Sequence, residues 1–203
     1  MEGRGRAGGS EGKEKLTASR VARDGADEGL LRTIDEPIAL VAYDPAWTAL
    51  FEAERERLLA LFPETFIDIV HIGSTAVPGL CAKPIVDLLA GVRSMDEAIA
   101  LDGPLCANGY TTSGEFNASL KDRQYFMRHE LGRRTHHLHV VVYEAEGWRV
   151  RVAFRDRLRD DTELQHRYSA LKADLAKRFA NDREAYTDGK SSFIAATMNA
   201  SCE

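Results

Sequence analysis

An almost continuously apolar run at residues 84–90 (PIVDLLA) constrains the fold more than any other part of the sequence. Such a run is typical of a central strand covered on both faces, which requires helices on the two sides of the sheet. Asp87 is the one charged residue in the run. An ionised carboxylate is costly there unless it is paired or binds a metal ion. Asp87 is therefore a candidate functional residue, and its alternative role is a salt bridge with Lys83 or an arginine.

The remaining pattern predicts an α+β fold, a mixed β-sheet with helices packed on it and helices at the C-terminal end. Further segments have the β-branched or alternating composition typical of strands: residues 38–43, 66–72, 110–116, 123–129 and 135–143. Helices are expected from capping residues and 3.6-residue spacing: residues 44–62, residues 94–108, the region from Trp148 onward, and residues 182–200.

The length of 203 residues fits a single domain, which we place at residues 34–203. Residues 1–33 are dominated by Gly, Arg and Glu without periodicity and predict a disordered tail. The three cysteines include no C-x-x-C pair, so we expect no disulfide framework and a reducing, cytoplasmic location. The oligomeric state is left open.

Charge and hydropathy limit the partners. A formal net charge of −5 gives no strong indication of nucleic-acid binding, which needs clustered Lys and Arg. No stretch approaches 18 apolar residues, so we expect no membrane partner. A small molecule or a nucleotide is the expected ligand.

The turn at residues 71–80 (HIGSTAVPGL) is a candidate phosphate site. Gly73 can adopt backbone angles that other residues avoid, so a ligand can come close. Ser74 and Thr75 offer hydroxyl and N–H groups that can bind phosphate oxygens if they converge, and Lys83 adds positive charge. The spacing is not that of a P-loop. The alternative is an ordinary β-turn.

Two histidines form a second candidate feature. On the strand at residues 135–143, His137 and His139 point to the same face, whereas His136 points to the other. Two imidazoles on one face can bind a metal ion or transfer protons near neutral pH. The alternative is a pair of half-buried structural histidines.

Basic side chains elsewhere are weaker candidates. Arg155 lies in the run FRDRLR, and guanidinium groups recognise phosphate. Taken alone, the run is better explained as a solvated helix face with internal ion pairs. Arg123, Lys172, Lys190 and Tyr168 are individually weak candidates.

The run at residues 71–80, followed by KPIVD at residues 83–87, resembles the GrpB family. The resemblance covers residues 37–200 and includes further matches in the same order: Tyr43-Asp44 with Trp47, Gly109-Tyr110, His137-Leu138-His139-Val140, Phe154-Arg155-Asp156 with Leu158-Arg159, Tyr168 with Leu171-Lys172, and Tyr186 with Lys190. It implies a DNA-polymerase-β-like nucleotidyltransferase fold. In that superfamily a Gly-Ser turn holds nucleotide phosphates, and acids two residues apart on the next strand, with a third from a later strand, bind divalent metal.

Gly73 and Ser74 match that turn and Asp87 matches the first acid, but Leu89 occupies the second acid position. The resemblance therefore implies either one divalent cation, Mg²⁺, Mn²⁺ or Zn²⁺, held by Asp87 with one or both of His137 and His139, or a site without metal. It indicates no organic cofactor.

We expect an enzyme that acts on a phosphate-containing small molecule by nucleotidyl or related transfer. Asp87 would bind the cation or orient the nucleophile, and His137 and His139 would complete the metal shell or act as general acid–base groups. The expected phosphate and substrate ligands are Gly73, Ser74, Thr75, Lys83, Arg155, His71, Arg123 and Lys172. The alternatives are a ligand-binding or accessory module with a degenerate metal site, and an enzyme with repurposed non-phosphoryl chemistry.

Overall fold

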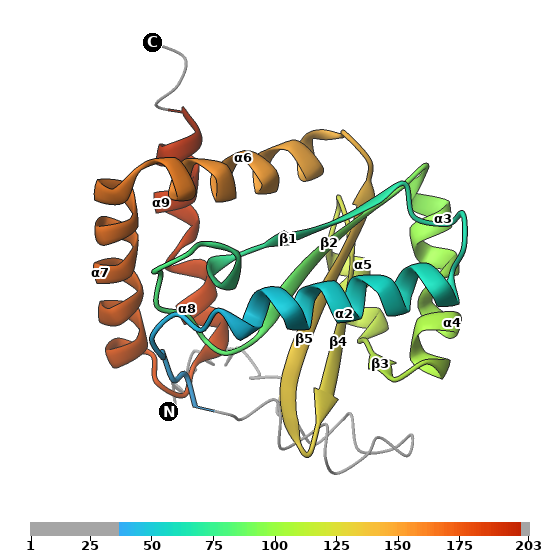
Figure 1. The fold of residues 1–203 in the computed structure, drawn as a ribbon, viewed down its shortest axis with the longest axis horizontal. Coiled ribbons are helices and arrows are strands. Elements are labelled where there is room, and N and C mark those ends of the chain that lie inside the picture. The colour runs from blue at the N-terminus through green and yellow to red at the C-terminus, as the bar shows by residue number, and fades with distance from the viewer. Residues whose placement is uncertain (1–36, 200–203) are drawn as a thin grey trace, which may run out of the picture.

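The computed structural model describes residues 37–199 as a five-stranded mixed sheet with helices on both faces (Figure 1). The strand order is β1-β2-β5-β4-β3; β2 and β5 run parallel, and the other neighbours are antiparallel. The expected α+β fold is thus confirmed. The tail predicted over residues 1–33 lies outside the described residues.

The strands are β1 (Asp68–Ile72), β2 (Val86–Val92), β3 (Tyr110–Thr111), β4 (Gln124–Glu130) and β5 (Arg133–Val142). The helices are α2 (Ala46–Leu61), the 3₁₀ helix η2 (Ser74–Ala76), α3 (Met95–Ala100), α4 (Asp102–Ala107), α5 (Gly114–Ser119), α6 (Glu146–Asp160), α7 (Thr162–Arg178), α8 (Arg183–Asp188) and α9 (Ser191–Asn199). Among residues 37–199, no helix combines the length and the apolar character needed to cross a membrane.

The two faces of the sheet have separate apolar cores. On one face α2, α3 and α4 cover the strands, and the fully buried side chains of Leu58, Leu88 and Leu138 belong to this core (Figure 1). On the other face Trp148 of α6 packs with Leu89 of β2 and neighbouring apolar residues. Strand β2 is therefore covered on both sides, which explains its nearly continuous apolar sequence.

The helices α6 and α7 form a hairpin that packs on the turn between β1 and β2. Val77 and Leu80 of this turn share an apolar cluster with Leu158, Leu164 and Tyr168 of the hairpin. In Figure 1 α7, α8 and α9 lie on the side of the molecule opposite to α3 and α4, and α6 runs from the end of β5 toward them. The C-terminal helices therefore enclose the turn that the sequence singles out.

Two predicted strands were wrong. The segment 110–116 pairs only over β3 and then forms α5, because Ser113 Oγ accepts a hydrogen bond from the Phe116 N–H at 3.3 Å and caps a helix. The segment 38–43 makes a single bridge, Val41 to Ala82, because Pro84 nearby has no N–H to extend the ladder.

Two predicted helices are each broken in two. The helix expected over residues 94–108 is divided between α3 and α4 at Leu101. The helix expected over residues 182–200 is divided between α8 and α9, and its break includes Gly189, where an added Cβ would lie 2.5 Å from a methyl carbon of Leu175. This break determines where the next residue, Lys190, is placed.

Candidate functional site

The turn between β1 and β2 lies directly against Asp87. Gly73 has a φ of 73° and a ψ of −172°, a conformation essentially restricted to glycine. An added Cβ at this position would collide with Oδ2 of Asp87. Glycine therefore allows the backbone to approach the carboxylate, and Ser74 follows at the start of η2.

Asp87 is paired across the sheet with His137, and their side chains are hydrogen-bonded. His137 Nδ1 donates to Asp87 Oδ1 at 2.9 Å, and His139 Nε2 lies 3.9 Å from the same oxygen. Tyr125 of β4 packs against both imidazoles, with ring centroids 5.4 and 5.2 Å apart. The Asp87 side chain is 26% exposed, so a ligand can reach it.

These three groups have defined protonation states at neutral pH. Burial opposes ionisation of Asp87, but the hydrogen bond from His137 and the nearby imidazole of His139 hold the pKa of its carboxyl well below its usual range. Burial lowers the pKa of His139 to about 4 and also lowers the pKa of His137. The site therefore presents a carboxylate between two neutral imidazoles. Nε2 of His139 faces this carboxylate, whereas His137 Nε2 and His139 Nδ1 are buried without a hydrogen-bond partner among residues 37–199.

Lys172 reaches the turn from α7. Its Nζ donates to Ser74 Oγ at 3.0 Å and to the carbonyl oxygen of Cys81, and it lies 4.8 Å from the centroid of the Tyr168 ring. The side chain is only 2% exposed, and burial lowers the pKa of Lys172 to about 8. This buried ammonium group fixes the helix hairpin to the turn.

Lys83 and Lys190 come from two further segments and meet at one aromatic ring. Their Nζ atoms lie 5.2 and 4.6 Å from the centroid of Tyr186. Burial, followed by the positive charges of Arg183 and Lys190, lowers the pKa of Lys83 to about 7. Burial also lowers the pKa of Lys190, whereas the charge of Asp87 raises it. We call Lys83, Lys172 and Lys190 the lysine cluster.

His71, Thr75 and Arg155 hold the turn from a different side. His71 stacks on Phe51 of α2, with ring centroids 4.8 Å apart, and its Nε2 donates to Thr75 Oγ1 at 3.0 Å. Burial lowers the pKa of His71 to about 4, so the ring is neutral. Arg155 donates from a terminal nitrogen to the His71 carbonyl oxygen at 3.0 Å. These contacts position the turn, and a direct role in phosphate binding stays a prediction.

Arg123 is not brought to the lysine cluster. It precedes Gln124, which pairs with Val140 of β5, whereas Lys83 precedes Val86, which pairs with His136. Arg123 and the lysine cluster therefore lie near opposite ends of β5, with Asp87, His137 and His139 between them.

The superfamily's pair of acids does not fit this chain. Leu89 is 0% exposed and packs with Ile72, Val141 and Trp148, so a carboxylate at its position would be buried among apolar side chains. Within residues 37–199, no three His, Cys, Asp or Glu side chains are arranged so that they could hold a metal ion. A single divalent cation at Asp87 stays a prediction.

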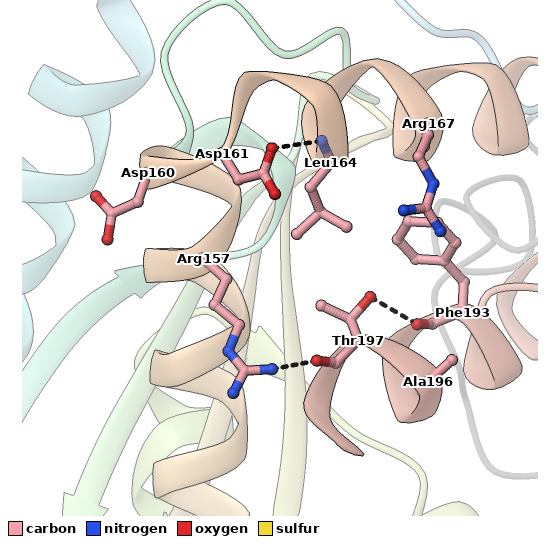
Figure 2. Close-up of a pocket in the computed structure, with 8 residues that line it drawn as sticks. All are labelled: Arg157, Asp160, Asp161, Leu164, Arg167, Phe193, Ala196 and Thr197. Atoms are coloured by element: carbon pink, nitrogen blue, oxygen red, sulfur yellow. Dashed lines mark hydrogen bonds between the residues drawn. The ribbon is translucent and has the colours of Figure 1, made fainter. Parts of the chain in front are cut away.

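Two cavities lie elsewhere. One of about 430 Å³ is bounded by α6, α7 and α9. Figure 2 shows three hydrogen bonds along its wall: Arg157 donates to the Thr197 carbonyl, the Thr197 hydroxyl donates to the Phe193 carbonyl, and Asp161 accepts from the Leu164 N–H. Another, of about 340 Å³, is lined by Arg155 and by residues of α2 and β1. Neither includes Asp87 or the lysine cluster.

Two tyrosines of the site were not among the residues singled out from the sequence. The sequence did not indicate Tyr125, because strand alternation predicts which face of the sheet its side chain is on but not which strand lies beside its own. Tyr186 was named only within the resemblance to the GrpB family, together with Lys190, and was given no role in the site.

The comparisons with known proteins show the family of the chain. The family model described as "GrpB protein" matches residues 37–200. The chain belongs to the GrpB family. It is similar to the crystal structure of the conserved protein GrpB from Enterococcus faecalis, with a TM-score of 0.70 and 32% identity, over 80% of this chain and 96% of that one.

Two curated relatives show how far the family likeness extends. The chain is 33% identical over 164 residues to the glutamate-rich protein GrpB of Alkalihalophilus pseudofirmus. This match covers 80% of this chain and 94% of the relative. It is 34% identical over 174 residues to the UPF0157 protein YqkA of Bacillus subtilis, which covers 83% of this chain. The match spans only 50% of YqkA, so this chain corresponds to about half of that relative.

Proposed function

We propose that the chain is an enzyme that binds a phosphate-bearing small molecule on the lysine cluster and transfers a nucleotidyl or related group beside Asp87. The observation that carries the proposal is the lysine cluster itself. Lys172 bonds Ser74 of the turn, Lys83 and Lys190 share the ring of Tyr186, and the charge of Asp87 acts on both Lys83 and Lys190. Burying like charges together opposes folding, and a bound anion compensates for it.

The charges favour a polyphosphate over a smaller anion. Besides the lysine cluster, Arg183 and Arg134 are close enough to lower the pKa of Lys83, whereas Asp87 acts on it in the opposite direction. A nucleoside triphosphate carries several negative charges, and lysines serve as point charges for phosphate oxygens.

The transfer that we propose is a substitution at phosphorus. A hydroxyl or amine of a second substrate attacks the α-phosphorus of a nucleoside triphosphate, pyrophosphate leaves onto the lysine cluster, and the proton of the attacking group passes to the neutral imidazole of His139. The resulting imidazolium lies 3.9 Å from Asp87 Oδ1 and is stabilised by that carboxylate. His137 holds Asp87 in place through the 2.9 Å hydrogen bond.

The chain's own residues do not fit a pair of cations, and we derive no step through a metal ion. A divalent cation bound with the nucleotide would neutralise charge on the phosphate oxygens. The carboxylate of Asp87 lies against Gly73 of the turn, so Asp87→Asn tests the single-cation prediction. Unchanged Mg²⁺, Mn²⁺ and Zn²⁺ affinities in this variant, measured by titration calorimetry, would remove Asp87 as a ligand.

The experiment is an assay of pyrophosphate release with ATP, CTP, GTP or UTP, divalent cations, and a panel of small hydroxyl, amine and carboxylate compounds. We expect release with one combination, and a loss of about hundredfold or more in His139→Ala, because a general base contributes that much. Lys172→Met should also lose activity, whereas Lys177→Met on the exposed side of α7 should not. Failure of every nucleotide both to bind and to react would contradict the proposal.

A second candidate is a module that binds the same anion without transfer chemistry. The burial of Leu89 in an apolar cluster favours it, because the acid that completes the superfamily's metal site has no room there. Nucleotide binding by the wild-type chain without any pyrophosphate release would support this candidate.

A further inference from the structure

Two arginines, Arg123 and Arg151, lie near the end of β5 that is farther from the lysine cluster. Arg123 precedes β4 and Arg151 belongs to α6, and both approach the carboxylate of Asp122. The distances from terminal guanidinium nitrogens to Asp122 oxygens are 3.9 Å for Arg123 and 3.0 Å for Arg151. One carboxylate thus serves two guanidinium groups, which leaves a formal charge of +1 on the trio.

Arg123 has an unused donor. Its Nε is buried from solvent and has no hydrogen-bond partner among residues 37–199. Arg151, by contrast, donates to Asp122 and to the carbonyl oxygen of Gly147. A buried N–H group without an acceptor costs free energy, and a bound acceptor would recover it.

The pair lies on the side of His139 that faces away from the lysine cluster. Burial is the main cause of the low pKa of His139, and the charges of Arg123 and Arg151 lower it further. The corresponding charges acting on His137 are those of Lys83 and Arg134. Asp87 and its two histidines therefore lie between two separate positively charged regions.

We propose that Arg123 and Arg151 bind a carboxylate group of the second substrate, so that the acceptor is a small carboxylic acid. This inference rests on the proposed function, in which the lysine cluster holds the phosphate-bearing substrate. The planar fork of a guanidinium group matches a carboxylate with two parallel hydrogen bonds. The buried Arg123 Nε–H lacks an acceptor among residues 37–199, and a carboxylate that enters beside it would supply one.

The charge of the trio selects a carboxylate over a phosphate. A carboxylate carries one negative charge, which the formal +1 of Arg123, Arg151 and Asp122 neutralises. A phosphate monoester carries about two charges at neutral pH, and its second charge would face Asp122. With its carboxylate held by Arg123 and Arg151, the rest of the acceptor extends toward His139 and Asp87.

The test is arginine Nε–H NMR spectroscopy of the full chain, with acetate and inorganic phosphate as probes. The Arg123 signal is assigned by its loss in Arg123→Lys, and the signal of the exposed Arg149 on α6, assigned in Arg149→Lys, serves as the matched control. We expect acetate to shift the Arg123 signal at concentrations that leave the Arg149 signal unchanged. We also expect the affinity for acetate to fall by about tenfold or more in Arg151→Gln, because one charge-assisted hydrogen bond is lost.

The proposal is overturned if acetate shifts both signals alike, or if phosphate shifts the Arg123 signal at lower concentration than acetate does. Binding of pyrophosphate, measured in parallel by calorimetry, separates the two proposals. If pyrophosphate binds and Arg123 does not respond to acetate, the carboxylate subsite alone is wrong. If Arg123 responds and pyrophosphate does not bind, the proposed function is wrong, and so is the assignment of this carboxylate to a second substrate.

Discussion

Replacing Lys83 by Met should stabilise the fold and weaken phosphate binding at the same time. The pKa of Lys83 falls from 10.5 to about 7 on folding. At about 1.4 kcal/mol per pH unit, this fall corresponds to at most about 5 kcal/mol of opposition to folding at pH 7. The ammonium group can turn partly toward water and gains from its contact with Tyr186. We therefore expect Lys83→Met to raise the free energy of unfolding by about 1–3 kcal/mol.

The pH dependence identifies the cause. Between pH 7 and pH 10.5 the unfolded chain holds the Lys83 proton and the folded chain does not, so the wild type gains stability from this group as the pH rises. The advantage of Lys83→Met should therefore be largest at pH 7 and nearly absent at pH 10.

Urea denaturation followed by circular dichroism at both pH values measures this difference. Lys177→Met, an exposed control on α7, should stay within about 0.5 kcal/mol of the wild type. A Lys83→Met variant that is less stable than the wild type at pH 7, or whose advantage is the same at pH 10, would refute the reasoning.

Three further predictions follow from the same geometry. Leu89→Asp places a charge in a closed apolar cluster and should destabilise the fold by about 3–5 kcal/mol in urea denaturation, and it should create no nucleotidyl transfer; a folded, active variant would contradict this. Gly73→Ala forces a side chain into Asp87 and into a φ of 73°, and should cost about 1–3 kcal/mol in thermal denaturation, whereas Gly132→Ala, also at positive φ but with nothing within 4 Å of the added Cβ, tests the backbone term alone. The affinity for pyrophosphate, measured by calorimetry, should fall as the pH rises from 7 to 9, by up to about tenfold per pH unit for each lysine that must be charged, because Lys83 and Lys172 have pKa values of about 7 and about 8; a constant affinity would show that these lysines do not bind the anion.

The sheet was largely predictable because its central strands carry strong local patterns. The apolar run around Asp87 indicated a strand covered on two faces, and alternation placed His137 and His139 together, as their shared contact with Tyr125 shows. The segment 110–116 was misread because its strand-forming residues are followed by a Ser113 cap that a helix uses. Local propensity does not decide between such competing hydrogen bonds.

The lysine cluster was less predictable from the sequence than Asp87 and the Gly73–Ser74 turn. Asp87 and the Gly73–Ser74 turn are close in sequence, so a strand–turn–strand pattern brings them together. The lysine cluster depends instead on how α7, α8 and α9 pack, and in particular on the break around Gly189 before Lys190. Such long-range placement depends on tertiary packing and leaves no periodic pattern in one sequence.

Arginines were the most difficult residues to place. Arg155 was grouped with the phosphate ligands because of its charge, yet its guanidinium group bonds the backbone of β1 at the His71 carbonyl. Arg123 was given the same role, but it lies near the end of β5 that is farther from the lysine cluster. Long, flexible side chains reach partners that the position of their Cα does not determine.

Calorimetric titration of pyrophosphate into the wild type, Lys172→Met and Lys177→Met at pH 7 tests the central claim most directly. The two lysines lie on the same helix, but only Lys172 is buried against Ser74. If the lysine cluster is the phosphate site, pyrophosphate binds to the wild type and to Lys177→Met with equal affinity, and to Lys172→Met at least about tenfold more weakly, since a lost charge-assisted hydrogen bond costs that much. Equal affinities for all three proteins, or no binding to any, would contradict the claim.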